Sequence, residues 1–119
     1  MGAIHASVIV RNPTEPDKAW EGKFLVDTGA MDSLVPRSTL VALGLKPRGR
    51  RIYEMADGTE VTMDVTTAEV EIMGQIAGAT ILFGEDDTEP LLGVTVLQSA
   101  RIAIDPASES LYKRRSSRL

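Results

Sequence analysis

One short segment of the sequence carries residue types that suit acid–base chemistry. Asp27-Thr28-Gly29-Ala30 directly follows the apolar run Phe24-Leu25-Val26. A carboxylate at the end of an apolar strand is costly when it is buried alone, so its presence there needs a reason. Gly29 lets the backbone turn sharply and lets its amide approach the carboxylate, and the Thr28 hydroxyl can hold a turn by hydrogen bonding. The segment therefore predicts one carboxylate, that of Asp27, presented rigidly from the end of a strand.

A single carboxylate cannot act as acid and base in the same step, whereas two copies brought together by a twofold axis can. The chain contains one Asp-Thr-Gly, so this chemistry would require a homodimer. Two other interpretations stay open at this point. Asp27 is an ordinary structural aspartate in a turn, or it belongs to a protein that has the fold of an enzyme without the activity.

Composition excludes several other kinds of site. The chain has 119 residues, of which 43% are hydrophobic and 25% charged, as expected for one soluble globular domain. It has no cysteine and one histidine, which removes thiolate sites and multi-histidine sites within one chain, so we expect neither a metal nor a cofactor. The net charge of −4 and the lack of a long apolar run predict no nucleic-acid or membrane partner. The lack of cysteine and of a recognisable secretory signal suggests a cytoplasmic location.

Short strands broken by turns must position the carboxylate. A loose alternation of apolar and polar residues predicts strands over 4–10, 18–26, 33–36, 50–56, 59–73, 75–83 and 101–104. Pro36 suits the first turn of a helix and Gly44 its end, so a short helix is predicted over 36–43, and residues 94–100 favour one or two further helical turns. Prolines and short polar residues predict loops over 12–17 and 84–90. This spacing of strands is typical of an all-β sandwich or barrel.

Two further features follow the Asp-Thr-Gly segment in a recognisable order. Asp57-Gly58 predicts a tight hairpin turn, and Leu91-Leu92-Gly93 places an apolar pair before a glycine. Together, at this length, the three features resemble the retropepsin-like aspartic proteases, the homodimeric branch that includes bacterial single-domain members. The resemblance covers residues 4–105. It implies an all-β, retropepsin-like closed barrel of short strands with a flap hairpin and one or two short helices. The domain would span residues 1–106, followed by a polar, basic tail over 107–119.

The resemblance assigns roles to the residues of the first motif. Asp27 would be the catalytic carboxylate, one from each protomer. Thr28 would lock the two motifs together across the dimer axis, and Gly29 would give close backbone approach and line the substrate cleft. Ala30 would complete the active-site support. Pepsin-like enzymes often have a hydroxyl residue at the Ala30 position, and without that hydrogen bond to the carboxylates we expect activity nearer neutral pH than pepsin's.

The resemblance also implies residues that bind substrate and residues that pack behind the site. Viral members follow the alanine with two acidic residues that grip the peptide backbone, whereas this chain has Met31 and then Asp32. Viral members also have an arginine after the second glycine, where this chain has Val94; losing the arginine and the first acid together leaves no unpaired buried charge. The substrate-binding residues would be Asp32 and, at the flap tip, Ala56, Asp57 and Gly58. Leu92 and Gly93 would pack behind the active-site loop.

The implied activity is that of an aspartic endopeptidase whose partners are a second copy of the chain and an extended polypeptide substrate. Two nearby carboxylates would share one proton; the ionised one would deprotonate a water, which attacks the peptide carbonyl. The alternative is a non-catalytic homodimeric peptide-binding module on the same fold. A weaker alternative is a monomeric β-barrel that binds an apolar small molecule. Trp20 suits the core, a dimer contact or a substrate contact, and the sequence does not separate these.

Overall fold

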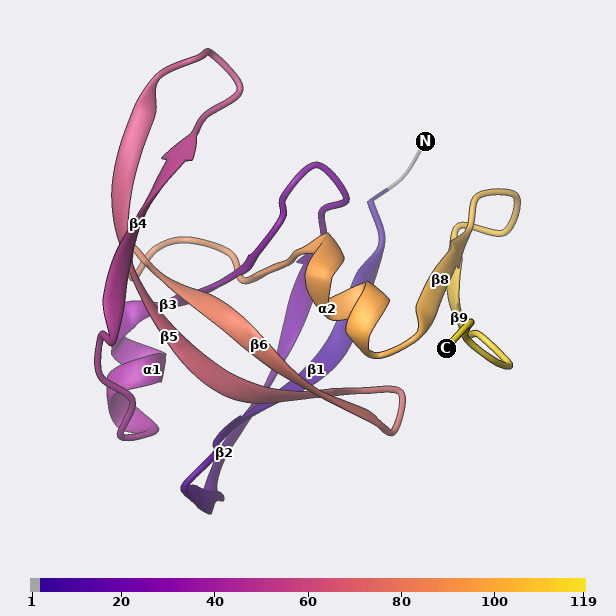
Figure 1. Ribbon diagram of the computed structural model, residues 1–119, viewed down its shortest axis with the longest axis horizontal. Helices are drawn as coiled ribbons and strands as arrows, with labels where there is room; N and C mark the ends of the chain where they lie inside the picture. Colours follow the sequence, from indigo (N-terminus) through magenta and orange to yellow (C-terminus); the bar gives the residue numbers. More distant parts are fainter. Residues whose placement is uncertain (1–2) are drawn as a thin grey trace.

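Two long antiparallel hairpins form most of the sheet in the computed structural model, which describes residues 3–119 (Figure 1). The first hairpin pairs β1 (His5–Asn12) with β2 (Glu15–Val26), and the second pairs β5 (Glu60–Ile72) with β6 (Gln75–Gly84). Residues 1 and 2, which the predicted domain includes, lie outside the described part of the chain.

Pairing between β1 and β5 closes the sheet into a barrel. Residues 8–11 of β1 pair with residues 69–72 of β5, so the strands form a closed circuit in the order β1-β2-β7-β3-β6-β5. In that circuit β7 (Leu91–Leu92) lies between β2 and β3 (Ser33–Pro36), parallel to β2 and antiparallel to β3. The prediction of an all-β closed barrel is confirmed.

Alternate residues of the barrel strands fill its interior, because successive side chains of a strand point to opposite faces. Val8 and Val10 of β1 and Val70 and Ile72 of β5 are at most 1% exposed. Trp20 packs against the same core at 5.7 Å from the Phe24 ring, and its indole covers Gly22 so closely that a Cβ there would collide with it. Trp20 is therefore partly buried against the core.

Two short helices lie where the sequence predicts them. α1 (Arg37–Ala42) begins after Pro36 and is followed by Gly44, whose φ of +78° is a left-handed conformation that glycine adopts without strain. α2 (Val94–Ser99) follows β7 directly. No helix within residues 3–119 has the length and apolar character needed to span a bilayer.

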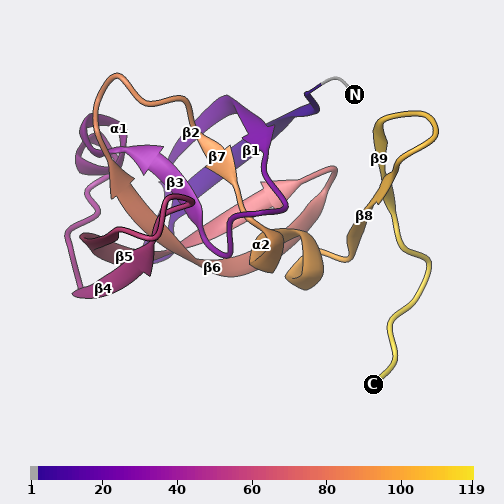
Figure 2. The same ribbon diagram turned by 90° about the horizontal axis from the view of Figure 1, so that it is seen from above.

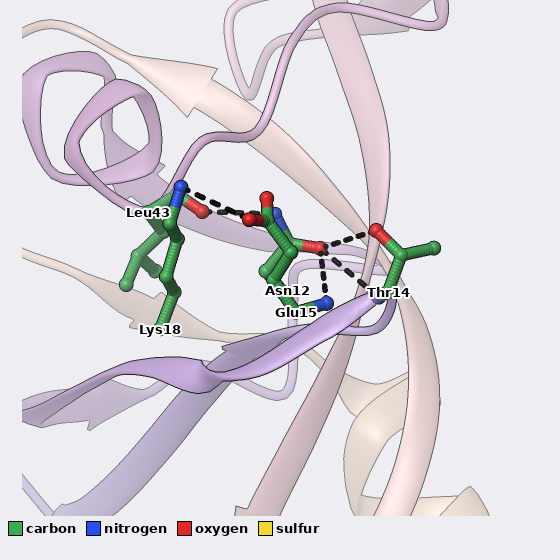
Figure 3. Close-up of polar contacts among 5 residues, drawn as sticks. All are labelled: Asn12, Thr14, Glu15, Lys18 and Leu43. Carbon is green, nitrogen blue, oxygen red and sulfur yellow. Dashed lines mark hydrogen bonds and ion pairs between the residues drawn. The ribbon is translucent and has the colours of Figure 1, made fainter.

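A buried asparagine ties the first hairpin to the end of α1 (Figure 3). Asn12 is 4% exposed, and its Nδ2 donates to the Leu43 carbonyl at 2.9 Å. Its Oδ1 accepts from the Thr14 amide and hydroxyl, both at 3.0 Å, and from the Glu15 amide at 3.3 Å. One side chain thus satisfies the backbone of the turn and the carbonyl beyond the helix.

The turn between β1 and β2 is shorter than the loop that the sequence predicts over 12–17. Strand β2 begins at Glu15, opposite Asn12, and then the register shifts so that Arg11 pairs with Ala19. Residues 16–18 consequently have no partner in β1. Pro16 falls in this unpaired stretch, where its missing N–H costs no ladder hydrogen bond. The proline therefore does not end the strand, which is why the predicted loop was too long.

The prediction of a polar tail over 107–119 is wrong for residues 110–113. There β9 (Ser110–Lys113) pairs with β8 (Ile102–Asp105) in a separate two-stranded sheet, and Leu111 packs against the core cluster. The Arg114 amide continues the pairing by donating to the Arg101 carbonyl at 2.7 Å. Figures 1 and 2 both show this hairpin extending away from the barrel.

A third hairpin extends beyond the barrel at another end. β4 (Gly49–Glu54) pairs with the first residues of β5, and the tip joining them projects past the sheet (Figure 1). At its base, Asp64 accepts from Arg37 of α1 at 2.7 Å and from Arg50 of β4 at 3.2 Å. The hydrogen bond from Arg37, with a second from Arg50, lowers the pKa of Asp64 below its usual value. The base of the hairpin is thereby joined to the helix.

We predict that Asn12→Ala lowers the free energy of unfolding by about 2–3 kcal/mol, because it leaves a buried carbonyl and two amides without partners. Urea denaturation of wild type and variant measures the difference. Thr14→Ala is the matched control, since it removes one exposed hydroxyl from the same cluster and should cost less than about 1 kcal/mol. Equal losses in the two variants would contradict a structural role for Asn12.

We predict that Asp64→Asn destabilises the protein at pH 7 and that this loss shrinks as the pH falls below about 4. The pKa of Asp64 is lower in the folded chain than in the unfolded one, so its ion pairs stabilise the fold above the unfolded pKa and are lost in acid. Urea denaturation from pH 3 to 7 measures this. Asp87→Asn, in an exposed loop, should show no such trend; a loss for Asp64→Asn that is constant with pH would contradict the prediction.

Candidate active site

Asp27 lies at the end of β2, where the chain leaves the barrel and enters the loop over residues 27–32, called here the active-site loop. The Asp27 amide donates to the Leu92 carbonyl at 3.0 Å, so β2 and β7 hold its backbone. The Gly29 amide donates to Asp27 Oδ1 at 3.0 Å, and the Ala30 amide donates to the Asp27 carbonyl at 3.1 Å. The carboxylate is half-buried and is oriented by its own loop.

The second motif, Leu91-Leu92-Gly93, lies directly behind this loop. A Cβ on Gly93 would come within 2.6 Å of the Asp32 carbonyl carbon and 2.7 Å of the Met31 oxygen, so only glycine fits there. The Val94 amide donates to the Ala30 carbonyl at 2.9 Å. Leu92 is fully buried. The tertiary structure therefore brings together Asp27, Gly29, Ala30, Leu92 and Gly93.

Two hydroxyl residues that no local sequence pattern singled out complete this packing. Ser33 is fully buried, and its Oγ accepts from the Gly93 amide at 2.8 Å. The Thr95 amide and hydroxyl both donate to the Met31 carbonyl, at 3.1 and 2.9 Å. A serine inside an apolar strand indicates that a buried polar partner exists, but no pattern in the neighbouring sequence identifies Gly93 as that partner.

Thr28 is exposed beside Asp27. Its predicted hydrogen bonds cross a dimer axis, so a single chain does not test them and the role stays a prediction. Met31, next in the loop after Ala30, is also exposed, with 66% of its surface accessible. The outer side of the active-site loop thus presents a hydroxyl and a large apolar side chain to its surroundings.

Asp32, predicted to bind substrate, has partners within its own chain. It is 8% exposed, and the Tyr53 hydroxyl of β4 donates to its Oδ2 at 2.7 Å. Arg51 lies 3.7 Å from the same oxygen, and the Thr95 hydroxyl lies 3.4 Å from Oδ1. Burial, together with the bond to Asp32, raises the pKa of Tyr53. Tyr53 and Arg51 carried no signal in the sequence, since only the folded barrel brings β4 beside the loop.

Ala56, Asp57 and Gly58 form the exposed tip of the β4–β5 hairpin, separate from the cluster around Asp27. The Gly58 amide donates to the Met55 carbonyl at 2.9 Å, and Gly58 has a φ of +88°. The Met55 amide donates to the Thr59 carbonyl at 2.7 Å, so the turn contains the three residues 56–58 rather than only the predicted Asp57 and Gly58. The Thr59 hydroxyl and amide donate to Asp57 Oδ1 at 2.6 and 3.0 Å, and the hydroxyl bond is the main cause of the lowered pKa of Asp57.

The hairpin and the active-site loop lie at the same end of the molecule (Figures 1 and 2). The hydrogen bond from Tyr53 to Asp32 joins the two directly. No group of three or more His, Asp or Glu side chains in residues 3–119 is arranged to hold a metal ion. The site holds an oriented carboxylate in a loop that is joined to a projecting hairpin.

Comparison with known proteins agrees with this arrangement. A family model described as "gag-polyprotein putative aspartyl protease" matches residues 18–99, a range that contains the active-site loop, the hairpin and Gly93. No curated protein matches the sequence. The solution structure of simian foamy virus (mac) protease is similar with a TM-score of 0.57 and 18% identity, over 80% of this chain and 92% of that chain. At this identity the likeness concerns the fold alone.

The family match covers more than half of the chain and includes both motifs. The barrel, with β7 inserted between β2 and β3, is similar to that of a retroviral protease. The chain therefore belongs to the gag-polyprotein aspartyl protease family and has a retropepsin-like fold.

Proposed function

We propose that the chain is an aspartic endopeptidase that acts as a homodimer, with Asp27 of each protomer activating one water molecule. The observation that carries the proposal is the Asp27 carboxylate itself. It is half-buried, it is oriented by the Gly29 amide at 3.0 Å, and its loop is backed by Gly93. A catalytic carboxylate gains from such pre-organisation, because little reorganisation is then needed during the reaction.

Two Asp27 carboxylates across a twofold axis would share a proton, because two like charges at short distance do not both ionise readily. The ionised carboxylate takes a proton from the water, while the protonated one hydrogen-bonds the scissile carbonyl. The water oxygen bonds to the carbonyl carbon. A proton then passes to the amide nitrogen and the C–N bond breaks, giving a free carboxyl and a free amine.

The substrate in this proposal is an extended polypeptide that lies between the active-site loops and the two β4–β5 hairpins. Extended peptides are recognised by main-chain hydrogen bonds to strand edges. The exposed apolar side chains of Met31 in the loop and Met55 at the hairpin, 66% and 52% accessible, would then face a partner or a peptide rather than water. Asp57 and Gly58 at the tip would cover the bound peptide.

We predict that wild type cleaves members of a mixed peptide library and that Asp27→Asn loses at least about 100-fold of this activity. Asparagine still accepts the Gly29 amide bond, so the loop should keep its shape while the proton acceptor is lost. Mass spectrometry of the products, from pH 4 to 8, measures the cleavage. Asp17→Asn, an exposed residue of β2, is the matched control and should be as active as wild type.

Intact peptides with wild type, in a sample shown to be dimeric and to bind them, would contradict the proposal. That result would favour the non-catalytic peptide-binding module. Equal cleavage by wild type and Asp27→Asn would instead assign the activity to a contaminant or to another residue.

We predict that activity depends on dimer formation. Specific activity should fall on dilution through the concentration at which analytical ultracentrifugation shows dissociation. Adding about a ninefold excess of Asp27→Asn should lower wild-type activity roughly tenfold, since random pairing leaves few wild-type protomers with a wild-type partner. The same excess of Asp17→Asn should raise total activity. Constant specific activity in a fully monomeric sample would overturn the homodimer mechanism.

A further inference from the structure

We propose that Asp32 and Tyr53 form a latch that positions the β4–β5 hairpin over the active-site loop, so that Asp32 acts through Tyr53 rather than by gripping the substrate. This inference rests on the proposed function, because it concerns how the hairpin covers the same site. It assigns Asp32 and Tyr53 as positioning residues.

The position of Asp32 is unusual for a residue that would bind a substrate. Its carboxylate belongs to a residue that is only 8% exposed, and in-chain donors already surround it. The Tyr53 hydroxyl lies 2.7 Å from Oδ2, and the Thr95 hydroxyl lies 3.4 Å from Oδ1. A buried carboxylate with these partners is stabilised where it is, and turning toward a peptide would cost those bonds.

The anchor side of the latch is firmly held by the barrel. The Asp32 carbonyl group is in close contact with Gly93, and the following residue, Ser33, binds the Gly93 amide. The Met31 carbonyl, just before Asp32, accepts two hydrogen bonds from Thr95. Asp32 therefore moves only if β7 and α2 move with it.

The hairpin side has few other attachments to the site. β4 is the last strand of the sheet order and pairs only with β5. Among residues 3–119, the Tyr53–Asp32 bond is the only hydrogen bond between β4 and the active-site loop, and Arg51 adds a longer ion pair to the same carboxylate. Removing the Tyr53 hydroxyl should therefore leave only the longer Arg51 ion pair between β4 and the loop, and loosen the hairpin without altering the barrel.

The charges around the latch keep it closed over a wide pH range. Burial and the Asp32 carboxylate raise the pKa of Tyr53, while Arg51 opposes that shift. The raised pKa keeps the Tyr53 hydroxyl protonated, and therefore a hydrogen-bond donor, at neutral pH and up to a pH above the usual pKa of tyrosine. Arg51 and Asp32 are the charged groups that face the Tyr53 hydroxyl in the described chain.

Tyr53→Phe tests the latch because it removes the hydroxyl and keeps the ring. We expect hydrogen–deuterium exchange of the amides in residues 54–60 to accelerate about tenfold, with little change in the barrel strands. Tyr112→Phe is the matched control, since Tyr112 is the only other tyrosine and is exposed on β9. Exchange at the hairpin that is the same in wild type and in both variants overturns the latch, and this readout does not depend on catalysis.

Kinetics separate a positioning role from a merely structural one. We expect Tyr53→Phe to raise KM about tenfold with kcat nearly unchanged, because a loosened hairpin weakens the complex and the transition state alike. Partial unfolding would instead lower apparent kcat at constant KM, and that result would count against the latch.

A double-mutant cycle separates positioning from direct substrate binding. If Asp32 acts through Tyr53, Asp32→Ala combined with Tyr53→Phe should lower kcat/KM no further than Asp32→Ala alone. Losses that multiply would show that Asp32 contacts the substrate directly, and would overturn the proposal. Should Asp32→Ala fail to fold, Asp32→Asn replaces the cycle: it keeps an acceptor for Tyr53, so KM and hairpin exchange should stay near the wild-type values, and a large rise in KM would overturn the proposal. Faster hairpin exchange in a protein that cleaves no peptide would refute the proposed function and leave the latch standing.

Discussion

The close approach of Gly93 to the active-site loop is the contact on which the site depends. Because residue 93 has no Cβ, the chain after β7 lies directly against the carbonyl groups of Met31 and Asp32. From there the Val94 amide reaches the Ala30 carbonyl, and Thr95 reaches that of Met31. These bonds satisfy the backbone of a loop that has no strand partner of its own. The loop therefore has one shape, and the barrel sets it through the insertion of β7 between β2 and β3.

With the backbone of the loop held in this way, a single backbone amide is enough to orient the Asp27 carboxylate. The Gly29 N–H binds one oxygen of Asp27 and leaves the half-buried carboxylate at the surface of the barrel. One chain then supplies one such carboxylate. Under the proposed function, a second carboxylate comes from an identical chain, so a small barrel gains a two-carboxylate site by symmetry instead of by a second domain.

The β4–β5 hairpin has to combine mobility with a defined position if it covers a substrate. A cover must open to admit a peptide and return to the same place. The hairpin is attached at two levels: Asp64 joins Arg37 and Arg50 at the root, and Asp32 joins Tyr53 closer to the tip. The tip is held mainly by its own turn, through Asp57 and Thr59. Such a hairpin can move at the tip while its root stays in register with the active-site loop.

Local patterns in the sequence determined the strands, the helix after Pro36, the hairpin around Gly58 and the motif around Asp27, because alternation, proline and glycine act on neighbouring residues. Only the tertiary structure decided the partners of Asp32, Ser33 and Asn12, which lie 21, 60 and 31 residues away along the chain. The polar segment Ser110–Lys113 also forms a strand, because it pairs with β8, although its composition by itself favours a solvated tail. Closure of the barrel determines which residues distant in the sequence come into contact. A polar residue in an apolar strand indicates that a hydrogen-bond partner is needed, but the sequence does not identify that partner.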